Sequence, residues 1–224
     1  MRKRFPRYVI YALLVVLLAP AGLLLLYRLI PPPVTPLMLI RDGKYDYRWT
    51  PLKRIAPALV RSVVTAEDEA FCQHNGFDKA ALEKAWDRYL DDDDDDGRKL
   101  RGGSTISQQT IKNLLLWPDR TWLRKGLEAW LTVYMETLWD KRRIVEIYLN
   151  IVEWGPGVYG AEAAAQHHFK KSASQLSNHE AALLAAVLPS PLKWSPTRPG
   201  PYVQTRSEII SGRATRLGAL ASCL

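Results

Sequence analysis

Glu67 is the first side chain whose surroundings could support acid–base chemistry. If the residues around it are helical, Val60, Val63, Val64 and Phe71 share its face, because they lie three, four or seven positions away. A carboxylate on such an apolar stripe loses hydration, which raises its pKa and makes it a proton acceptor near neutral pH. The alternative is a helix-surface glutamate whose neighbours happen to be apolar, since structural carboxylates outnumber catalytic ones.

A second candidate site begins at a pair of glycines. The sequence G-G-S-T-I-S-Q-Q-T-I-K-N covers residues 102–113, and Thr105 with Gln108 three positions later has the form of a capping box. A helix that begins there presents free backbone N–H groups and the positive end of its dipole, which suit an anion. Gln108 and Gln109 lie four and three positions before Lys112, so the polar side of this helix indicates a site for a phosphate-bearing ligand. An ordinary capped amphipathic helix explains the same spacing.

A cationic stripe follows on the next expected helix, which runs from Pro118-Asp119 to about Asp140. Arg120, Arg124 and Glu128 recur at steps of four, so they share one face of that helix. This pattern favours a second carboxylate flanked by cations. The alternative is a surface ladder of ion pairs, each worth only about 0.3 kcal/mol.

Three other patterns carry less weight. The glycines of residues 155–160 match the dinucleotide fingerprint G-x-G-x-x-G, but no alternating strands and helices surround them, so we expect a turn between helices. His167 and His168 are adjacent and point in different directions, which makes a poor metal pair. The six aspartates of residues 91–96 favour a solvated loop, because a monotonous run lacks fixed metal-ligand geometry. We therefore assign no metal ligands.

The elements that must position these groups start with an apolar segment. Residues 8–27 contain no charge and reach about 30 Å as a helix, the thickness of a bilayer core, so we expect a transmembrane anchor over residues 8–30 after a basic tail, residues 1–7. A cleaved signal peptide is the alternative, with a small-residue site at Ala19–Ala21, although the apolar run continues past it. The basic tail favours a cytoplasmic N-terminus.

The rest of the chain divides by composition. Proline-rich residues 31–54 indicate an extended linker, residues 55–200 a mostly α-helical domain, and residues 201–224 a basic C-terminal helix and tail. Five of the charges behind the formal net charge of +8 lie in or beside the anchor, and no recognition motif accompanies the rest, so a nucleic-acid partner is not expected. The spacing of Cys72 and Cys223 neither demands nor excludes a disulfide.

Five ordered segments resemble the motifs of peptidoglycan glycosyltransferases of family 51. They are E-D-E-A-F-C-Q-H-N-G-F-D (67–78), G-G-S-T-I-S-Q-Q-T-I-K-N (102–113), R-K-G-L-E (124–128), K-R-R-I-V-E-I-Y-L-N (141–150) and A-A-L-L-A-A-V-L-P-S-P (181–191). The resemblance implies an all-α, lysozyme-like lobe with a smaller membrane-proximal jaw lobe, after one N-terminal transmembrane helix. Since the chain ends at residue 224, it is similar to the monofunctional biosynthetic type, without a transpeptidase domain.

The resemblance also implies roles for residues. Glu67 corresponds to the base that deprotonates the acceptor's 4-hydroxyl for attack on C1 of the lipid II donor, and Glu128 to the second carboxylate, which orients the donor or assists the leaving group. Lys112, Arg120 and Arg124 correspond to pyrophosphate-binding positions. Further positions expected to bind substrate or shape the site are Asp68, Phe71, His74, Ser104, Thr105, Gln108, Gln109 and Asn113. One departure is Cys72, which stands where an aromatic residue is frequent.

The expected setting is the bacterial inner membrane, with a single-pass anchor and a periplasmic catalytic domain. The partners implied are lipid II, the growing glycan strand, the membrane, and other cell-wall synthesis or division proteins. No tightly bound cofactor is implied, although a divalent cation such as Mg²⁺ on the pyrophosphate is compatible with the family. Two alternatives are kept: a lysozyme-like muramidase, and a catalytically silent membrane-anchored scaffold.

Overall fold

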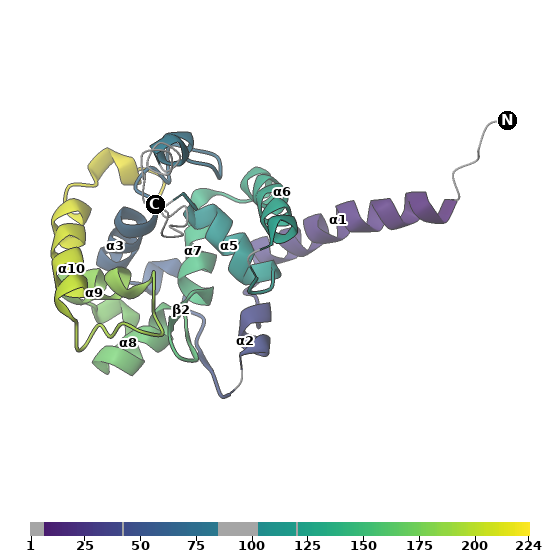
Figure 1. Cartoon of the computed structure of the whole chain (residues 1–224). Coiled ribbons are helices and arrows are strands. Elements are labelled where there is room, and N and C mark those ends of the chain that lie inside the picture. Colours follow the sequence, from purple (N-terminus) through teal and green to yellow (C-terminus); the bar gives the residue numbers. More distant parts are fainter. Residues whose placement is uncertain (1–6, 42, 85–102, 120) are drawn as a thin grey trace, which may run out of the picture.

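The computed structural model describes residues 7–41, 43–84, 103–119 and 121–224. It consists of a helical domain from which one long helix, α1 (Arg7–Leu29), projects (Figure 1). Within the described ranges α1 is the one helix long and apolar enough to cross a membrane, with a mean hydropathy of 2.8 over its best stretch. Pro20 lies inside it without ending it.

The C-terminal end of α1 is bound to the domain. Leu24 is fully buried, and its carbonyl accepts a hydrogen bond from the Trp139 indole at 2.8 Å. Arg143 donates to the carbonyls of Tyr27 and Ile30. This end of the helix is therefore part of the folded domain.

Two groups of helices build the domain core: α9 packs against α3 and α10, while α5 packs against α6 and α7. The helices are α3 (Pro57–Glu67), α5 (Ile106–Leu115), α6 (Trp122–Leu138), α7 (Lys141–Ile151), α8 (Ala161–Phe169), α9 (Asn178–Val187) and α10 (Pro201–Ala214). The apolar helix α9 is buried at every position from Ala181 to Val187. The expectation of a mostly helical fold is confirmed.

The helix that carries Glu67 ends earlier than its pattern predicts. A helix that placed Phe71 on the face of Glu67 would have to continue to Phe71, whereas α3 stops at Glu67 and the next residue, Asp68, leaves helical geometry with φ −166° and ψ 73°. Phe71 is nevertheless fully buried, because the turn after Asp68 folds it into the core. Glu67 is thus the last residue of a helix, at the start of a sharp turn.

The prediction of an extended linker over residues 31–54 is wrong in part. The segment contains α2 (Pro36–Ile40), β1 (Asp46–Tyr47) and the 3₁₀ turn η1 (Leu52–Arg54). Thr35 caps α2, and Pro36 at its first position favours a helix rather than opposing one.

A small sheet holds this segment against the domain. Its order is β1-β3-β2, with β1 parallel to β3 (Val158–Tyr159) and β3 antiparallel to β2 (Glu153–Gly155). The glycine-rich turn expected at residues 155–160 thus belongs to a β-hairpin between α7 and α8. Gly160 has φ +88°, and a Cβ there would lie 2.6 Å from the Asn150 carbonyl oxygen.

The C-terminal segment is joined to the domain rather than set apart from it. It consists of α10, which the sequence places at about Tyr202 to Leu217, and the 3₁₀ turn η3 (Gly218–Ala221). α10 packs on α3 and α9, and Cys223 forms a disulfide with Cys72, a pairing that the sequence left open. The remaining short element is the 3₁₀ turn η2 (Ala173–Gln175).

Some sequence predictions cannot be compared with the structure. The hexa-aspartate of residues 91–96 and Arg120 lie outside the described residues. Asp78 caps the start of the next helix: its carboxylate accepts from the Ala81 N–H at 2.9 Å, and residues 79–84 are helical.

Candidate active site

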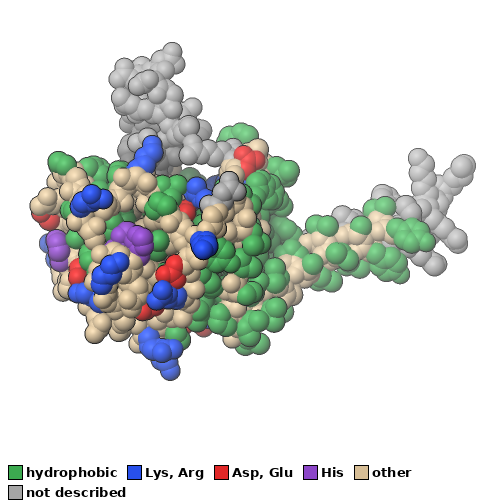
Figure 2. Space-filling model, turned by 90° about the horizontal axis from the view of Figure 1, so that it is seen from below, with side chains coloured by type: hydrophobic (Ala, Val, Ile, Leu, Met, Phe, Trp, Pro, Cys, Tyr) green, Lys and Arg blue, Asp and Glu red, His purple; other side chains and the backbone are tan. Residues whose placement is uncertain are grey.

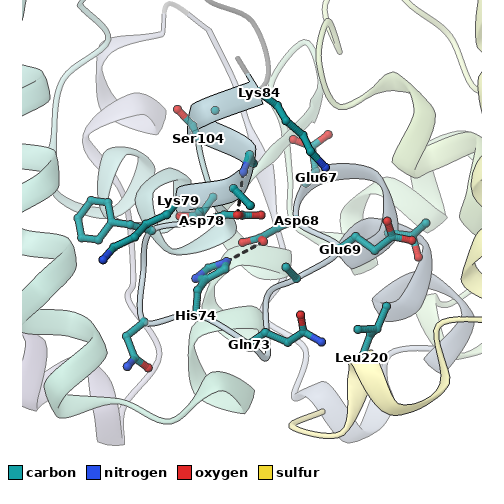
Figure 3. Close-up of a pocket in the computed structure, with 18 of the residues that line it drawn as sticks. Glu67, Asp68, Glu69, Gln73, His74, Asp78, Lys79, Lys84, Ser104 and Leu220 are labelled. Atoms are coloured by element: carbon teal, nitrogen blue, oxygen red, sulfur yellow. Dashed lines mark hydrogen bonds and ion pairs between the residues drawn. The ribbon is translucent and has the colours of Figure 1, made fainter. Parts of the chain in front are cut away.

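A pocket of 960 Å³ opens beside the end of α3. It is lined by residues 65–70 and 73–75 of the turn, by residues 77–81 and Lys84, by residues 103–105 and by Leu220 near the C-terminus. Figure 3 shows the carboxylates of Glu67, Asp68 and Glu69 in this pocket. The pocket therefore combines acidic side chains with a concave wall large enough for a sugar ring.

The Glu67 carboxylate is held from two sides. Its Oε2 accepts a hydrogen bond from Gln109 Nε2 at 2.9 Å, and its Oε1 lies 3.8 Å from an Nη of Arg206. Burial raises the pKa of Glu67, as the apolar stripe predicts, and the nearby Asp68 charge raises that pKa further. The Gln109 hydrogen bond and the charges of Arg206 and Lys112 act in the opposite direction. The net upward shift makes Glu67 a stronger proton acceptor than an exposed glutamate.

Asp68 occupies the anion site expected at the start of α5. Its Oδ2 accepts from the backbone N–H of Ile106 at 2.9 Å, and its Oδ1 lies 2.8 Å from His74 Nε2. The N–H groups of Thr105 and Gln108 are taken up by the predicted capping box, which is present. The prediction of free N–H groups for a ligand is therefore wrong at these positions, because the anion at this helix start is the protein's own carboxylate.

Three of the expected site residues are structural in their contacts. Thr105 and Gln108 are almost fully buried in the cap, and Thr105 Oγ1 also donates to the Gly76 carbonyl at 2.6 Å. Phe71 is buried, stacks edge-on against His74, and lies 4.5 Å below the Lys141 ammonium. These side chains hold the turn that carries Glu67.

A second pocket of 700 Å³ lies on the other side of α5. The expected substrate-binding residues that line it are Ser104, Gln109, Lys112, Asn113 and Arg124, together with Glu128. Ser104 lines both pockets, and Gln109 reaches from the second pocket to Glu67 in the first. The two pockets are thus neighbours across the α5 side chains.

Lys112 is a cation that remains available in the second pocket. It makes no hydrogen bond or ion pair within 4 Å to any described residue, and burial lowers its pKa, although the Glu128 charge opposes that shift. A desolvated ammonium without a close partner gains by meeting an anion.

Glu128 is occupied on both oxygens. Arg124 Nη1 donates to Oε2 at 2.6 Å, as the predicted stripe implies, and Lys125 donates to Oε1. Lys125 also donates to Ser104 Oγ at 3.2 Å, so it lies at the mouth of the same pocket. Lys125 was not predicted as a site residue, although its position three residues before Glu128 is a usable signal.

Two further residues of the site escaped the sequence analysis. Arg206 comes from α10, far along the chain, and Tyr148 on α7 donates to Gln109 Oε1 at 3.2 Å. Both act on Glu67, directly or through Gln109. Nothing local in the sequence signals either contact.

Two of the carboxylates that line the second pocket are already paired with cations. Glu128 is paired with Arg124 and Lys125, and Glu153 with Arg41. In the described part of the chain, no group of three or more acidic, histidine or cysteine side chains could hold a metal ion. The pocket carries cationic side chains instead, which suit an anionic ligand.

Known proteins with the same sequence pattern are numerous. The transglycosylase family profile matches residues 37–215. A biosynthetic peptidoglycan transglycosylase of Caulobacter vibrioides is 53% identical over 99% of this chain and 97% of its own length. Proteins of the same name from Rhodospirillum centenum and Pseudomonas aeruginosa are 51% and 46% identical, over 95% and 89% of this chain and 90% and 88% of their own lengths.

Proposed function

The chain belongs to the transglycosylase family and is a peptidoglycan glycosyltransferase, and from this premise we propose that Glu67 is the base with which it joins lipid II units into β-1,4 glycan strands. The proposal rests above all on one arrangement: a buried carboxylate with a raised pKa lies one helix away from a pocket of cations. A base beside an anion-binding pocket suits a sugar donor that leaves as a pyrophosphate.

The reaction divides between the two pockets. The first pocket holds the acceptor sugar, whose 4-hydroxyl gives its proton to a Glu67 oxygen as the hydroxyl oxygen attacks C1 of the donor's MurNAc. The bond from C1 to the pyrophosphate oxygen breaks, its electron pair leaves with the lipid pyrophosphate, and C1 is inverted. Water is not consumed, which separates this chemistry from that of a glycosidase.

The second pocket holds the pyrophosphate. Lys112 is free to bind it, while Arg124 and Lys125 are already fixed by Glu128 and add positive charge where the leaving group becomes more negative. Because both Glu128 oxygens are occupied, its role is to position these two cations. Arg120 belongs to the same proposed set. No step of the proposed mechanism is routed through a divalent cation, because Glu128 and Glu153 are already paired with cations.

Membrane attachment fits the lipid-linked substrate. Besides α1, the domain exposes large apolar side chains on α2, just after α5 and at the start of α6, namely Leu39, Ile40, Trp117, Trp122 and Leu123. Figure 2 shows hydrophobic side chains gathered on the face of the domain next to α1. We propose that this face contacts the bilayer, with the N-terminus in the cytoplasm and the domain outside the inner membrane.

The test is polymerisation of labelled lipid II by the detergent-solubilised protein. We expect long glycan strands from the wild type and from Glu208→Gln, a matched change at an exposed position of α10, and none from Glu67→Gln. Full activity of Glu67→Gln would overturn the assignment of the base. Cleavage of purified glycan strands, without consumption of lipid II, would instead indicate a muramidase, and binding of cell-wall proteins without any turnover would indicate a scaffold.

Lys112→Ala tests the pyrophosphate pocket separately. Loss of one desolvated cation should raise the KM for lipid II at least tenfold while the far-ultraviolet circular dichroism remains helical. Normal turnover by this variant would place the pyrophosphate elsewhere.

A further inference from the structure

The C-terminal segment, residues 201–224, lies against the turn that carries the catalytic base. α10 packs on α3 with Val203, Ile210 and Ala214 buried, and α3 is the helix that ends at Glu67. Leu220, in the 3₁₀ turn η3, lines the first pocket. Figure 3 shows this side chain on the C-terminal segment, on the other side of the pocket from His74. Part of the pocket wall thus comes from the end of the chain.

Arg206 brings a cation from this segment to the base. One guanidinium nitrogen donates to the Ala66 carbonyl at 3.3 Å and lies 3.8 Å from Glu67 Oε1. Its Nε is buried with no hydrogen-bond partner, and just over a quarter of the side chain is exposed. Arg206 therefore spans from α10 to the last turn of α3 without being bound tightly to the carboxylate.

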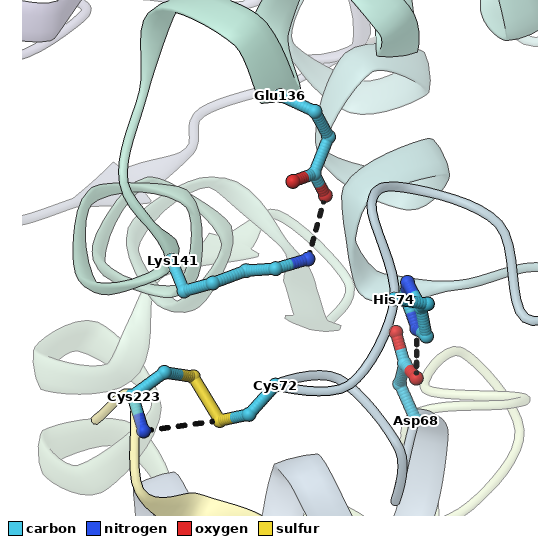
Figure 4. Close-up of a disulfide and its surroundings, with 6 residues drawn as sticks. All are labelled: Asp68, Cys72, His74, Glu136, Lys141 and Cys223. Atoms are coloured by element: carbon cyan, nitrogen blue, oxygen red, sulfur yellow. Dashed lines mark hydrogen bonds and ion pairs between the residues drawn. A yellow bond between two sulfur atoms is a disulfide. The ribbon is translucent and has the colours of Figure 1, made fainter.

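Two further ties hold the segment to the turn after Glu67. Arg213 donates to both oxygens of Glu69, and Cys223 is disulfide-bonded to Cys72, with Cα atoms 5.6 Å apart. Figure 4 shows the disulfide beside the Asp68–His74 pair of the same turn. The disulfide closes a loop of 151 residues, and the chain contains no other cysteine.

We propose that residues 201–224 are a positioning element of the active site, fastened to the catalytic turn by the Cys72–Cys223 disulfide so that Arg206 stays beside Glu67 and Leu220 completes the acceptor pocket. This inference rests on the proposed role of Glu67 as base. Without the disulfide, the buried Val203, Ile210 and Ala214 still pack α10 on α3 and α9. Beyond them, the segment keeps the exposed Arg213–Glu69 pair against the turn, and this pair contributes little.

The pH dependence of turnover distinguishes a segment that positions Arg206 beside Glu67 from a disulfide that only stabilises the fold. Glu67 faces Asp68 at the end of its own helix, Gln109 and Lys112 from α5, Arg206 from α10, and the Tyr148 hydroxyl of α7 behind Gln109. Of these groups, only Arg206 belongs to residues 201–224, the segment joined to the turn by the disulfide. If it moves away, Glu67 loses one charge that favours its ionised form, so the acid limb of the pH–rate profile moves to higher pH.

The experiment compares lipid II turnover by the oxidised wild type, by the same protein after treatment with a dithiol reductant, and by the Cys72→Ser/Cys223→Ser variant. Reduction proceeds by exchange: the reductant's two thiols become its own disulfide, and Cys72 and Cys223 become thiols. We expect about a tenfold loss of kcat/KM and an upward shift of the acid limb in both altered proteins, and no response of the double variant to the reductant.

Arg206→Gln and Arg206→Lys complete the test. The glutamine variant should show the same upward shift with the disulfide intact, and the lysine variant should largely restore the wild-type profile. An unchanged profile after reduction, or a loss of rate that is equal at every pH, would overturn the proposed positioning. Absence of turnover in the oxidised wild type would instead count against the proposed function, so the two failures are distinguishable.

Discussion

At the scale of single residues, a buried chain of hydrogen bonds joins Tyr148 to Glu67. The Tyr148 hydroxyl donates to Gln109 Oε1, and Gln109 Nε2 donates to Glu67 Oε2. An ionised carboxylate can only accept, so the amide nitrogen of Gln109 must face it and the amide oxygen must face a donor. Burial raises the pKa of the Tyr148 phenol well above its usual value, which keeps that donor protonated. Tyr148 thus sets which end of the Gln109 amide faces the base.

Tyr148→Phe should therefore weaken catalysis without removing any group that touches substrate. Loss of one buried hydrogen bond, about 1 kcal/mol, corresponds to about a fivefold decrease in kcat if it is felt in the transition state. The acid limb of the pH–rate profile should also move upward, because the Gln109 bond lowers the pKa of Glu67. Tyr134→Phe on α6 is the matched control, and equal effects of the two changes would contradict the argument.

Glu67 also makes folding pH-dependent. Its pKa is raised in the folded chain, so the folded state holds this proton more tightly than the unfolded state does. The contribution of Glu67 to the free energy of unfolding is therefore most favourable at pH values below its pKa in the unfolded chain. This contribution is lost as the pH rises through its pKa in the folded chain. We expect Glu67→Gln to have a Tm that equals or exceeds that of the wild type at neutral pH, with the difference shrinking towards pH 4. Thermal melts in detergent from pH 4 to pH 7 measure this difference in Tm between the variant and the wild type. A difference that becomes less favourable to the variant as the pH rises from 4 to 7 would contradict the argument.

At the scale of elements, what could be predicted depends on sequence separation. The Thr105–Gln108 capping box and the Arg124–Glu128 pair are local, and both are present as predicted. The Arg206 contact spans 140 positions, so no periodicity or spacing could reveal it. The same limit explains the α5 start, where the pattern predicts an anion site but cannot tell that Asp68, 38 positions earlier, supplies the anion.

Asp68→Ala tests this coupling between α3 and α5. It leaves the buried Ile106 N–H unpaired and removes the negative charge from the start of α5, which together should destabilise the fold by about 1–3 kcal/mol. Asp68→Asn keeps an acceptor and should cost about half as much. Chemical unfolding followed by circular dichroism measures both, with Asp46→Ala, at the exposed Arg48 pair, as the control. A loss no larger than that of the control would mean that the helix start does not need this carboxylate.

At the scale of the whole molecule, the C-terminal end of α1 and the domain form an interface with apolar and polar contacts, which include Leu24, Trp139 and Arg143. Residues 31–54 look like a free linker because prolines dominate them, and composition cannot reveal that β1 pairs with β3 or that Leu24 inserts beside Trp139. With Arg143 bound to the carbonyls at the end of α1, the domain does not swing on a flexible tether. With α1 in the bilayer, as proposed above, this attachment would set the orientation of both pockets relative to the membrane.

Two truncations separate the membrane role of α1 from this structural one. Removal of residues 1–22 takes away most of the exposed apolar helix but keeps Leu24, Tyr27 and Ile30, so the domain should melt close to the full chain. Removal of residues 1–30 uncovers the Leu24 site and the Arg143 donors. Loss of one fully buried leucine alone is worth about 2 kcal/mol, which for a domain of this size lowers Tm by about 4–8 °C.

Both truncations should lose membrane binding to a similar degree, because both lack the spanning length. Equal Tm values for the two would mean that the joint adds nothing to the fold, and that the domain orientation is set by the apolar face alone.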